Sequence, residues 1–315
     1  MKLNALHLGV VGAGAVGGYF GGLLARAGHQ VTLIARQAQA EAINSSGLRI
    51  ESAQWQCHVG HPQLRAATHP AELRSAQGVL LCVKSGDTES ASAQIGPHLG
   101  PDCWVMSLQN GVDNAARAQE VLQRPVIPAL VYVAAAVTQT GIVQHFGRGD
   151  LVVGCPSPRV GEFFSDAALN EIADVFRQAD IPVMVSNNVM HALWSKLLVN
   201  CAFNAISALA QVDYGTLSSH PTIRPVMHGI VEEVVRVARA GGIELDLHGG
   251  LEACEQIIVG MTRQRSSTAQ DLARRKRSEI DHLNGFIVRE GERLGIPTPI
   301  NRTLHALVKL VESTF

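Results

Sequence analysis

A glycine-rich turn near the start of the chain limits its fold more than any other feature. The apolar run Leu6–Val11 predicts a short buried strand, and a G-x-G-x-x-G sequence follows it at once and opens a helical stretch. Such a turn allows a tight bend, close approach of the backbone to a pyrophosphate, and close packing of helix on strand. The helix N-terminus then faces the negative charge. The alternative is a structural glycine turn in another α/β protein. The residues expected to bind a dinucleotide are Gly12, Ala13, Gly14, Ala15, Val16 and Gly17.

Short apolar runs alternate with helical stretches through the first half of the chain. The runs flanked by turn residues predict buried parallel strands at Leu6–Val11, Val31–Ala35, Val79–Val83 and Trp104–Leu108. Three more runs extend the predicted sheet, at Val126–Val137, Ile142–Phe146 and Leu151–Val153. From Val189 onward only helical periodicity remains, and it predicts helices over residues 189–210, 222–240, 248–264, 267–294 and 300–312.

The predicted architecture therefore has two parts. Residues 1–187 form an α/β, Rossmann-type dinucleotide-binding domain, and residues 188–315 form an all-α C-terminal domain that supplies substrate-binding and catalytic groups. A chain of 315 residues with 46% hydrophobic residues is long enough to bury a core in each.

Charge and cysteine content exclude several classes of protein. The chain has 26 Lys and Arg against 27 Asp and Glu, so it lacks the basic excess that nucleic-acid phosphates require. Six cysteines without a C-x-x-C pair favour a reducing compartment over a disulfide framework. The longest near-apolar run, Val126–Val137, is too short to cross a bilayer. We expect a cytoplasmic protein that uses no metal and binds neither nucleic acid nor membrane. The sequence does not decide whether the chain forms a homodimer.

The end of the second predicted strand indicates which dinucleotide is bound. NAD-binding proteins usually carry Asp or Glu there, to accept hydrogen bonds from the adenosine ribose. This chain has Ala35-Arg36 instead. A carboxylate would repel a 2′-phosphate, whereas a guanidinium can bind it through charge-assisted hydrogen bonds. The sequence predicts NADP(H), with Arg36 holding the phosphate; the alternative is an exposed arginine in a loop.

Polar residues follow two of the predicted strands. Lys84 ends the run from Val79, and Gln109-Asn110-Gly111 ends the run from Trp104. Because ligands of open α/β sheets bind beyond the carboxyl ends of the strands, Lys84 and Asn110 are candidate cofactor contacts, and Asn110 is also a candidate substrate contact. A solvated strand end and a simple turn are the alternatives.

A polar stripe runs along the apolar segment 189–210. Lys196, Asn200 and Asn204 recur every four residues among leucine, valine and phenylalanine. Steps of four residues keep side chains on one helix face. One ammonium and two amides on one face suit a small carboxylate or carbonyl substrate. The alternative is a stripe that faces solvent.

The segment from residue 267 contains a candidate acid. Ser267 with Gln270 resembles a capping box that begins a helix, and Glu279 follows twelve residues after Ser267. Spacing alone favours a surface position for this carboxylate. The run Arg274–Arg277 is expected to be a solvated face.

Taken together, these motifs resemble the ketopantoate reductase (2-dehydropantoate 2-reductase) family, over essentially the whole chain. The resemblance includes the glycine turn, the strand that ends in Lys84, Leu-Gln-Asn110-Gly, Leu-Trp-x-Lys196-Leu-x-x-Asn200-x-x-x-Asn204, Ser266-Ser267 and Glu279-Ile-Asp-x-x-Asn-Gly. It implies a Rossmann domain with a helical C-terminal domain, and NADPH as cofactor. It also implies Lys196 as general acid, with Asn110, Asn200, Asn204 and Ser267 as contacts to a small 2-oxo acid. Glu279 would be a second catalytic residue that holds a substrate hydroxyl or the nicotinamide ribose.

Three other functions remain open. A related reductase would act on another small 2-oxo acid. A β-hydroxyacid dehydrogenase has a similar plan and a lysine on a helix, but a different lysine–asparagine pattern is expected of it. A non-catalytic NADPH-binding protein would have no need of Lys196 and Glu279 together.

Overall fold

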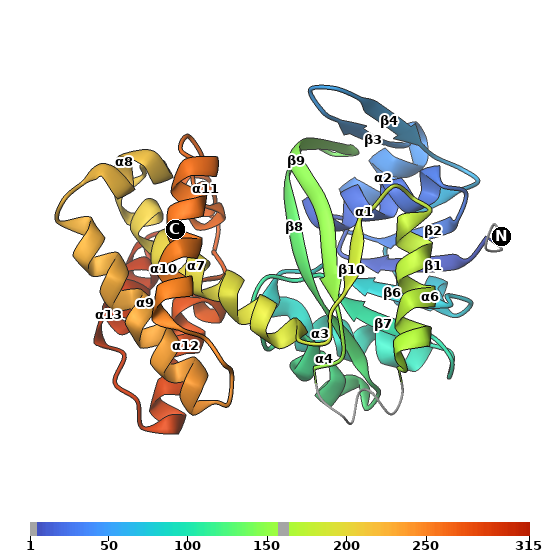
Figure 1. Ribbon diagram of the computed structural model, residues 1–315. Coiled ribbons are helices and arrows are strands. Elements are labelled where there is room, and N and C mark those ends of the chain that lie inside the picture. Colours follow the sequence, from blue (N-terminus) through green and yellow to red (C-terminus); the bar gives the residue numbers. More distant parts are fainter. Residues whose placement is uncertain (1–4, 157–163) are drawn as a thin grey trace. The chain divides into compact units, whose positions relative to one another are not determined.

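The computed structural model describes residues 5–156 and 164–315, and the chain separates into two compact units, Met1–Val189 and Met190–Phe315 (Figure 1). The first unit is a sheet with helices, and the second consists of helices (Figure 1). The predicted fold class, a Rossmann-type α/β domain with an all-α C-terminal domain, is confirmed.

One ten-stranded sheet organises the first unit. The strand order is β4-β3-β9-β8-β7-β6-β1-β2-β5, and β10 pairs with β9. The strands are β1 His7–Val11, β2 Gln30–Ile34, β3 Leu48–Glu51, β4 Gln56–Val59, β5 Leu64–Ala67, β6 Gly78–Leu81, β7 Trp104–Ser107, β8 Val126–Gln139, β9 Ile142–Val153 and β10 Val183–Val185. The four runs predicted as buried parallel strands are β1, β2, β6 and β7, and they pair in parallel as expected.

Helices cover both faces of this sheet. They are α1 Ala15–Arg26, α2 Gln37–Ser46, α3 Thr88–Ile95, α4 Asn114–Leu122 and α6 Asp166–Arg177, with 3₁₀ turns η1 Pro70–Leu73, η2 Ser85–Asp87 and η3 Gly96–His98. Successive residues of β6 enter different hydrophobic clusters: Leu80 joins the one that contains Phe20 and Phe176, and Leu81 joins the one that contains Ile95. Burial on both faces explains why the central strands read as continuous apolar runs.

One expectation about strands was wrong, and three short strands were missed. The runs Ile142–Phe146 and Leu151–Val153 are one continuous strand, β9, which pairs antiparallel with β8. The polar residues between them form an irregular part of the ladder, with register shifts, instead of a turn. The short strands β3, β4 and β5 were not predicted, because each is only four residues long and lacks the continuous apolar run on which the strand predictions were based.

The second unit contains α8 Tyr214–Ser219, α9 Ile223–Ala240, α10 Leu247–Gly260, α11 Ser267–Ala273, η4 Ile280–His282, α12 Asn284–Leu294 and α13 Pro299–Glu312. Helix α7, Val189–Ala210, begins at the boundary of the two units and continues into the second. By length and composition α7 could cross a membrane, but 67% of its most apolar window is buried inside the protein, which is typical of a core helix.

The single helix predicted over residues 267–294 was wrong. Helix α11 ends at Ala273, Arg275 has a φ of 53°, and regular helix resumes only at Asn284. A positive φ at a non-glycine residue ends a helix, and hydrophobic spacing carries no signal for it. Glu279 therefore lies in a non-helical connection, directly before η4.

Candidate active site

The three glycines of the N-terminal turn have different surroundings. Gly12 has a φ of +102°, and a side chain there would meet the backbone of Cys82 and Val83 at 2.8 Å. A side chain at Gly17 would press on Val10 at 2.9 Å. Gly14, by contrast, has nothing within 4 Å of the place where its side chain would begin. The turn is therefore crowded at its two outer glycines and open at the middle one.

This open position lies at the N-terminus of α1. Gly14 is the N-cap residue, no side chain caps the helix, and its first turn contains no acidic residue. An uncapped helix N-terminus presents free N–H groups and a partial positive charge. Open space, N–H donors and positive potential together fit the pyrophosphate of a dinucleotide. The side chain of Gln39, which the sequence did not single out, donates to the carbonyl of Ala13 at 3.3 Å and steadies the turn.

Arg36 lies next to this turn in the fold. The N–H of Gly12 donates to the carbonyl of Ile34 at 3.0 Å, and Arg36 follows two residues later as the N-cap residue of α2. Its side chain is exposed. The end of β2 therefore places a cation at the same edge of the sheet as the glycine turn.

Lys84 and Asn110 follow neighbouring strands. Leu81 of β6 pairs with Ser107 of β7, and each chain then enters a short loop. Lys84 is exposed and precedes η2, while Asn110 is half-buried and precedes Gly111, whose φ is +105°. The fold brings both residues to the carboxyl edge of the sheet that also carries the glycine turn.

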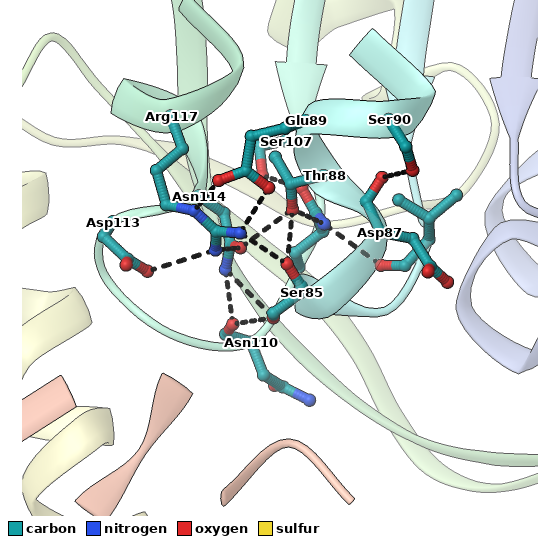
Figure 2. A network of polar contacts seen from close by, with 12 residues as sticks. Ser85, Asp87, Thr88, Glu89, Ser90, Ser107, Asn110, Asp113, Asn114 and Arg117 are labelled. Atoms are coloured by element: carbon teal, nitrogen blue, oxygen red, sulfur yellow. Dashed lines mark hydrogen bonds and ion pairs between the residues drawn. The ribbon is translucent and has the colours of Figure 1, made fainter. Parts of the chain in front are cut away.

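A buried polar network joins these two loops (Figure 2). The carbonyl of Asn110 accepts from the Ser85 hydroxyl at 2.9 Å and from the Asn114 amide at 2.6 Å. Thr88 donates to the carbonyl of Ser85 at 2.9 Å and accepts from the amide of Gln109 at 2.8 Å. The side chain of Asn110 points away from the network (Figure 2). The backbone of the Asn110 loop is thus held while its amide side chain remains outside the network.

Arg117 closes the outer side of this network. Its guanidinium binds both oxygens of Glu89, at 2.7 and 2.6 Å, and donates to the carbonyl of Ser85 at 2.9 Å. Sequence reasoning missed Ser85, Thr88, Asn114 and Arg117. Local sequence patterns carry no signal for them, because the bonds that join the two loops connect residues 21 to 32 positions apart.

The polar stripe of α7 changes in burial along the helix. Lys196 and Asn200 are half-buried, whereas Asn204 is buried. The Tyr214 hydroxyl lies 3.4 Å from Asn204 Oδ1 and donates to it. Burial raises the pKa of Tyr214 to about 12, so the hydroxyl keeps its proton. Because Oδ1 faces Tyr214, the Asn204 amide nitrogen is the atom left to donate to a ligand.

The N-cap role within the pair Ser266-Ser267 differs from the prediction. Ser266, not Ser267, is the N-cap residue of α11: its hydroxyl accepts from the N–H of Ala269 at 3.0 Å and donates to the carbonyl of Asn204 at 3.2 Å. The N-cap therefore lies one residue earlier than predicted, and the expected capping box does not form, because the third helical residue is Ala269. Ser267 is the first helical residue and is exposed, so its hydroxyl does not cap the helix.

Charged side chains of α13 hold the connection that carries Glu279. Just before Glu279, the N–H and hydroxyl of Ser278 donate to Glu312 at 2.7 and 2.6 Å. Just after it, Asp281 accepts from His305 and from Lys309, each at 2.7 Å. The hydrogen bond from His305, and then that from Lys309, hold the pKa of Asp281 well below its usual range. Half-buried Glu279 is thus fixed from both sides without being a member of a regular helix.

Comparison with known proteins gives this arrangement a family. Residues 8–158 match the family described as ketopantoate reductase PanE/ApbA, and residues 188–312 match the ketopantoate reductase PanE/ApbA C terminal. The chain belongs to the ketopantoate reductase family. The 2-dehydropantoate 2-reductase of Pyrococcus horikoshii is 32% identical, over 96% of this chain and 97% of its own. That of Halobacterium salinarum is 33% identical, over 96% and 98%.

Solved structures agree with this assignment. A PanE/ApbA family ketopantoate reductase from Ralstonia eutropha JMP134 has a TM-score of 0.90 and 46% identity, covering 98% of this chain and 99% of its own. D-mandelate dehydrogenase with NADH and anilino(oxo)acetate has a TM-score of 0.89 at 24% identity, with coverage of 98% and 99%. At that identity the second likeness concerns the fold alone. Among the residues that the structure describes, no cluster of three or more His, Cys, Asp or Glu suits a metal ion.

Proposed function

We propose that this protein is a cytoplasmic NADPH-dependent reductase that converts the ketone of 2-dehydropantoate (ketopantoate) to (R)-pantoate, a step of pantothenate biosynthesis. The observation that carries the proposal is the stripe of Lys196, Asn200 and Asn204 on α7, in a chain whose full-length relatives are named 2-dehydropantoate 2-reductase. In this proposal residues 1–187 bind the cofactor and residues 188–315 supply the catalytic and substrate-binding groups.

Features of the α/β unit support a nicotinamide dinucleotide as the cofactor. The residue that follows its second strand supports NADP(H) in particular. The open position at Gly14 and the uncapped α1 accept the pyrophosphate, with Gly12, Ala13, Ala15, Val16 and Gly17 forming the turn. Exposed Arg36, two residues after the carbonyl that binds Gly12, holds the 2′-phosphate. Lys84 and Asn110, at the carboxyl edge of the same sheet, complete the cofactor site.

The helical unit supplies the proton and orients the acid. Reduced nicotinamide, when bound, provides the hydride for the ketone carbon. Lys196 stabilises the negative charge that builds on the ketone oxygen and donates a proton to it. Asn200, Asn110 and Ser267 bind the polar groups of the substrate, and the amide nitrogen of Asn204, oriented by Tyr214, donates to its carboxylate. Glu279 accepts from a substrate hydroxyl or from the nicotinamide ribose. Fixing these groups in advance lowers the entropic part of the barrier.

A substrate panel tests the reaction. NADPH oxidation is followed at 340 nm with ketopantoate, other 2-oxo acids including phenylglyoxylate, and, in the reverse direction with NADP⁺, 3-hydroxy acids. We expect the highest kcat/KM with ketopantoate. Preference for another 2-oxo acid would favour the related reductase, and oxidation of 3-hydroxy acids would favour a β-hydroxyacid dehydrogenase. Tight NADPH binding without turnover on any of them would leave only a binding protein.

The choice of cofactor has its own test. Replacing Arg36 with Ala should raise KM for NADPH by roughly 10- to 100-fold, since hydrogen bonds to charged groups contribute about 1.5–3 kcal/mol. KM for NADH should stay within a few-fold of wild type. A wild-type preference for NADH that survives the substitution would contradict the assignment.

A further inference from the structure

A second cavity lies in the α/β unit, apart from every residue assigned above. Its volume is about 330 Å³, at the lower end of the roughly 300–1,000 Å³ typical of small-molecule sites. Tyr19, Leu23 and Arg26 line it from one face of α1, since they are spaced by four and three residues. The other walls are Trp55, between β3 and β4, then His145 and residues 148–150 of β9, and Asp180 with Pro182. Arg26 ends α1, roughly 16 Å along the helix from the glycine turn.

A buried histidine in this cavity lacks one hydrogen bond. His145 is 8% exposed, and its Nε2 lies 2.5 Å from the carbonyl oxygen of Arg148. A carbonyl only accepts, so Nε2 carries a proton. Nδ1 is also buried, and within the described residues it has no hydrogen-bond partner. Unpaired buried polar atoms are rare in folded proteins, so the packing of Tyr19 and Trp55 around this ring comes at the cost of one hydrogen bond.

An irregular piece of β9 shapes the rim. Arg148 has a φ of 55°, Gly149 a φ of 145°, and the register with β8 shifts at Tyr132 and Val133. A side chain at Gly149 would strike the hydroxyl of Tyr19, so only glycine fits there. Bulges of this kind redirect side chains and are frequent beside functional sites. Here the guanidinium of Arg148 lies 3.7 Å over the ring of Tyr132.

Aromatic rings and one loosely held cation dominate the lining. Tyr19 stacks on His145 with centroids 4.6 Å apart, and Trp55 lies 5.6 Å from His145. Arg148 binds both oxygens of Asp150, at 2.9 and 2.6 Å. Arg26 makes a single 2.8 Å contact with Asp180, whose side chain is 85% exposed. Such an exposed pair is weak, so a ligand anion can replace Asp180 at Arg26.

We propose that this cavity is a second ligand site, specific for a planar aromatic anion. The ring packs on Trp55, and the carboxylate or phosphate binds Arg26. The guanidinium of Arg26, 5.8 Å from the centre of the Trp55 ring, brings the anion site beside the aromatic wall. The site does not depend on the proposed reaction.

Isothermal titration calorimetry with 2-naphthoate tests the proposal. The protein is saturated with NADP⁺, so that the ring cannot enter the cofactor site. We expect one saturable site with a Kd below about 1 mM. Neutral 2-naphthylmethanol should bind at least tenfold more weakly, and 2-naphthyl phosphate should compete, which shows whether phosphate or carboxylate is preferred.

Variants locate the binding. Arg26→Gln and Trp55→Leu should each weaken 2-naphthoate at least tenfold, and Arg26→Lys should weaken it less. Lys196→Gln, which alters the proposed substrate site, should leave the affinity unchanged. A melting temperature close to wild type confirms that each variant is folded. The proposal is wrong if 2-naphthoate does not saturate, if Arg26→Gln and Trp55→Leu bind like wild type, or if Lys196→Gln abolishes binding.

Discussion

Two loops that carry proposed site residues are held in place by different chemistry. In the α/β unit, the loop with Asn110 is bound directly by neutral side chains that are almost fully buried, Ser85 and Asn114, and the ion pair Arg117–Glu89 lies on the outer side of this network (Figure 2). In the helical unit, the connection with Glu279 is fixed by charged side chains: buried Glu312 holds Ser278, and the side chains of Asp281 and Lys309 are 43% and 39% exposed. Neutral buried bonds respond little to pH and salt, whereas exposed ion pairs respond to both.

The two units also differ in what presents the functional groups. The glycine turn offers backbone N–H groups and an absence of side chains, so its function depends on conformation. Helix α7 offers an ammonium and two amides, so its function depends on side-chain identity. Substitutions in the glycine turn should therefore act through shape and stability, and those on α7 through chemistry.

The largest effect is expected on α7. Lys196→Ala should lower kcat by roughly 10²–10⁴, because the proposed general acid is lost. NADPH binding, followed by fluorescence, should change little, since the glycine turn is untouched. If kcat stays within a few-fold of wild type, the claim that α7 acts through the identity of its side chains is wrong.

Two glycine substitutions test the claim that the glycine turn acts through its backbone conformation. Gly12→Ala forces a side chain into a φ of +102° and against the Cys82 backbone at 2.8 Å, and should lower the free energy of unfolding by about 1–3 kcal/mol. Gly14→Ala has free space and a φ of −81°, so it should fold normally. Its methyl group should nevertheless occupy the pyrophosphate position and raise KM for NADPH roughly tenfold, about 1.4 kcal/mol. Equal melting temperatures for the two variants would contradict this description of the turn.

A charge removed from α13 should weaken catalysis from a distance. Glu312→Gln disturbs the carboxylate that binds Ser278, and we expect kcat to fall roughly three- to tenfold, about 0.7–1.4 kcal/mol, as Glu279 loses its fixed position. Glu292→Gln is the matched control, because Glu292 pairs with Arg302 at the surface of the same unit. If both variants have wild-type kcat, the α13 network has only a structural role.

The smallest effect is expected on the stability of the protein at low pH. Since the pKa of Asp281 is lowered in the folded protein, its ion pairs contribute their full stability above the ordinary carboxyl pKa of 3.8. That contribution is lost as the pH falls through the lower folded value. Between pH 4 and 2 the wild type should lose about 1–3 °C more in melting temperature than Asp281→Asn, a small difference because the pair is exposed. Identical acid profiles would show that the network adds no stability.

Much of this architecture could be predicted from local patterns. Central strands such as β6 are buried on both faces, so they appear in the sequence as unbroken apolar runs. The glycine turn could be predicted because the spacing of its glycines is dictated by the shape of the turn. By contrast, the half-exposed strands β3 and β4 lack a continuous apolar run, and the left-handed Arg275 interrupts a pattern that otherwise predicts one helix.

The supporting residues were beyond prediction because their partners are distant in the chain. Ser85 and Asn114 are 29 positions apart, and Ser278 and Glu312 are 34 apart. Each looks like an ordinary polar residue until the fold brings its partner near. The orientation of the Asn204 amide likewise depends on Tyr214, ten residues later and on another helix.

The central claim is that the lysine of α7 and the glycine turn serve one reaction, and a crystal structure of the ternary complex with NADP⁺ and pantoate tests it most directly. We predict the pyrophosphate on Gly12–Gly17 and Lys196 Nζ within about 2.6–3.2 Å of the pantoate hydroxyl oxygen. A structure in which Lys196, Asn200 and Asn204 face bulk solvent, away from the nicotinamide, would contradict the account.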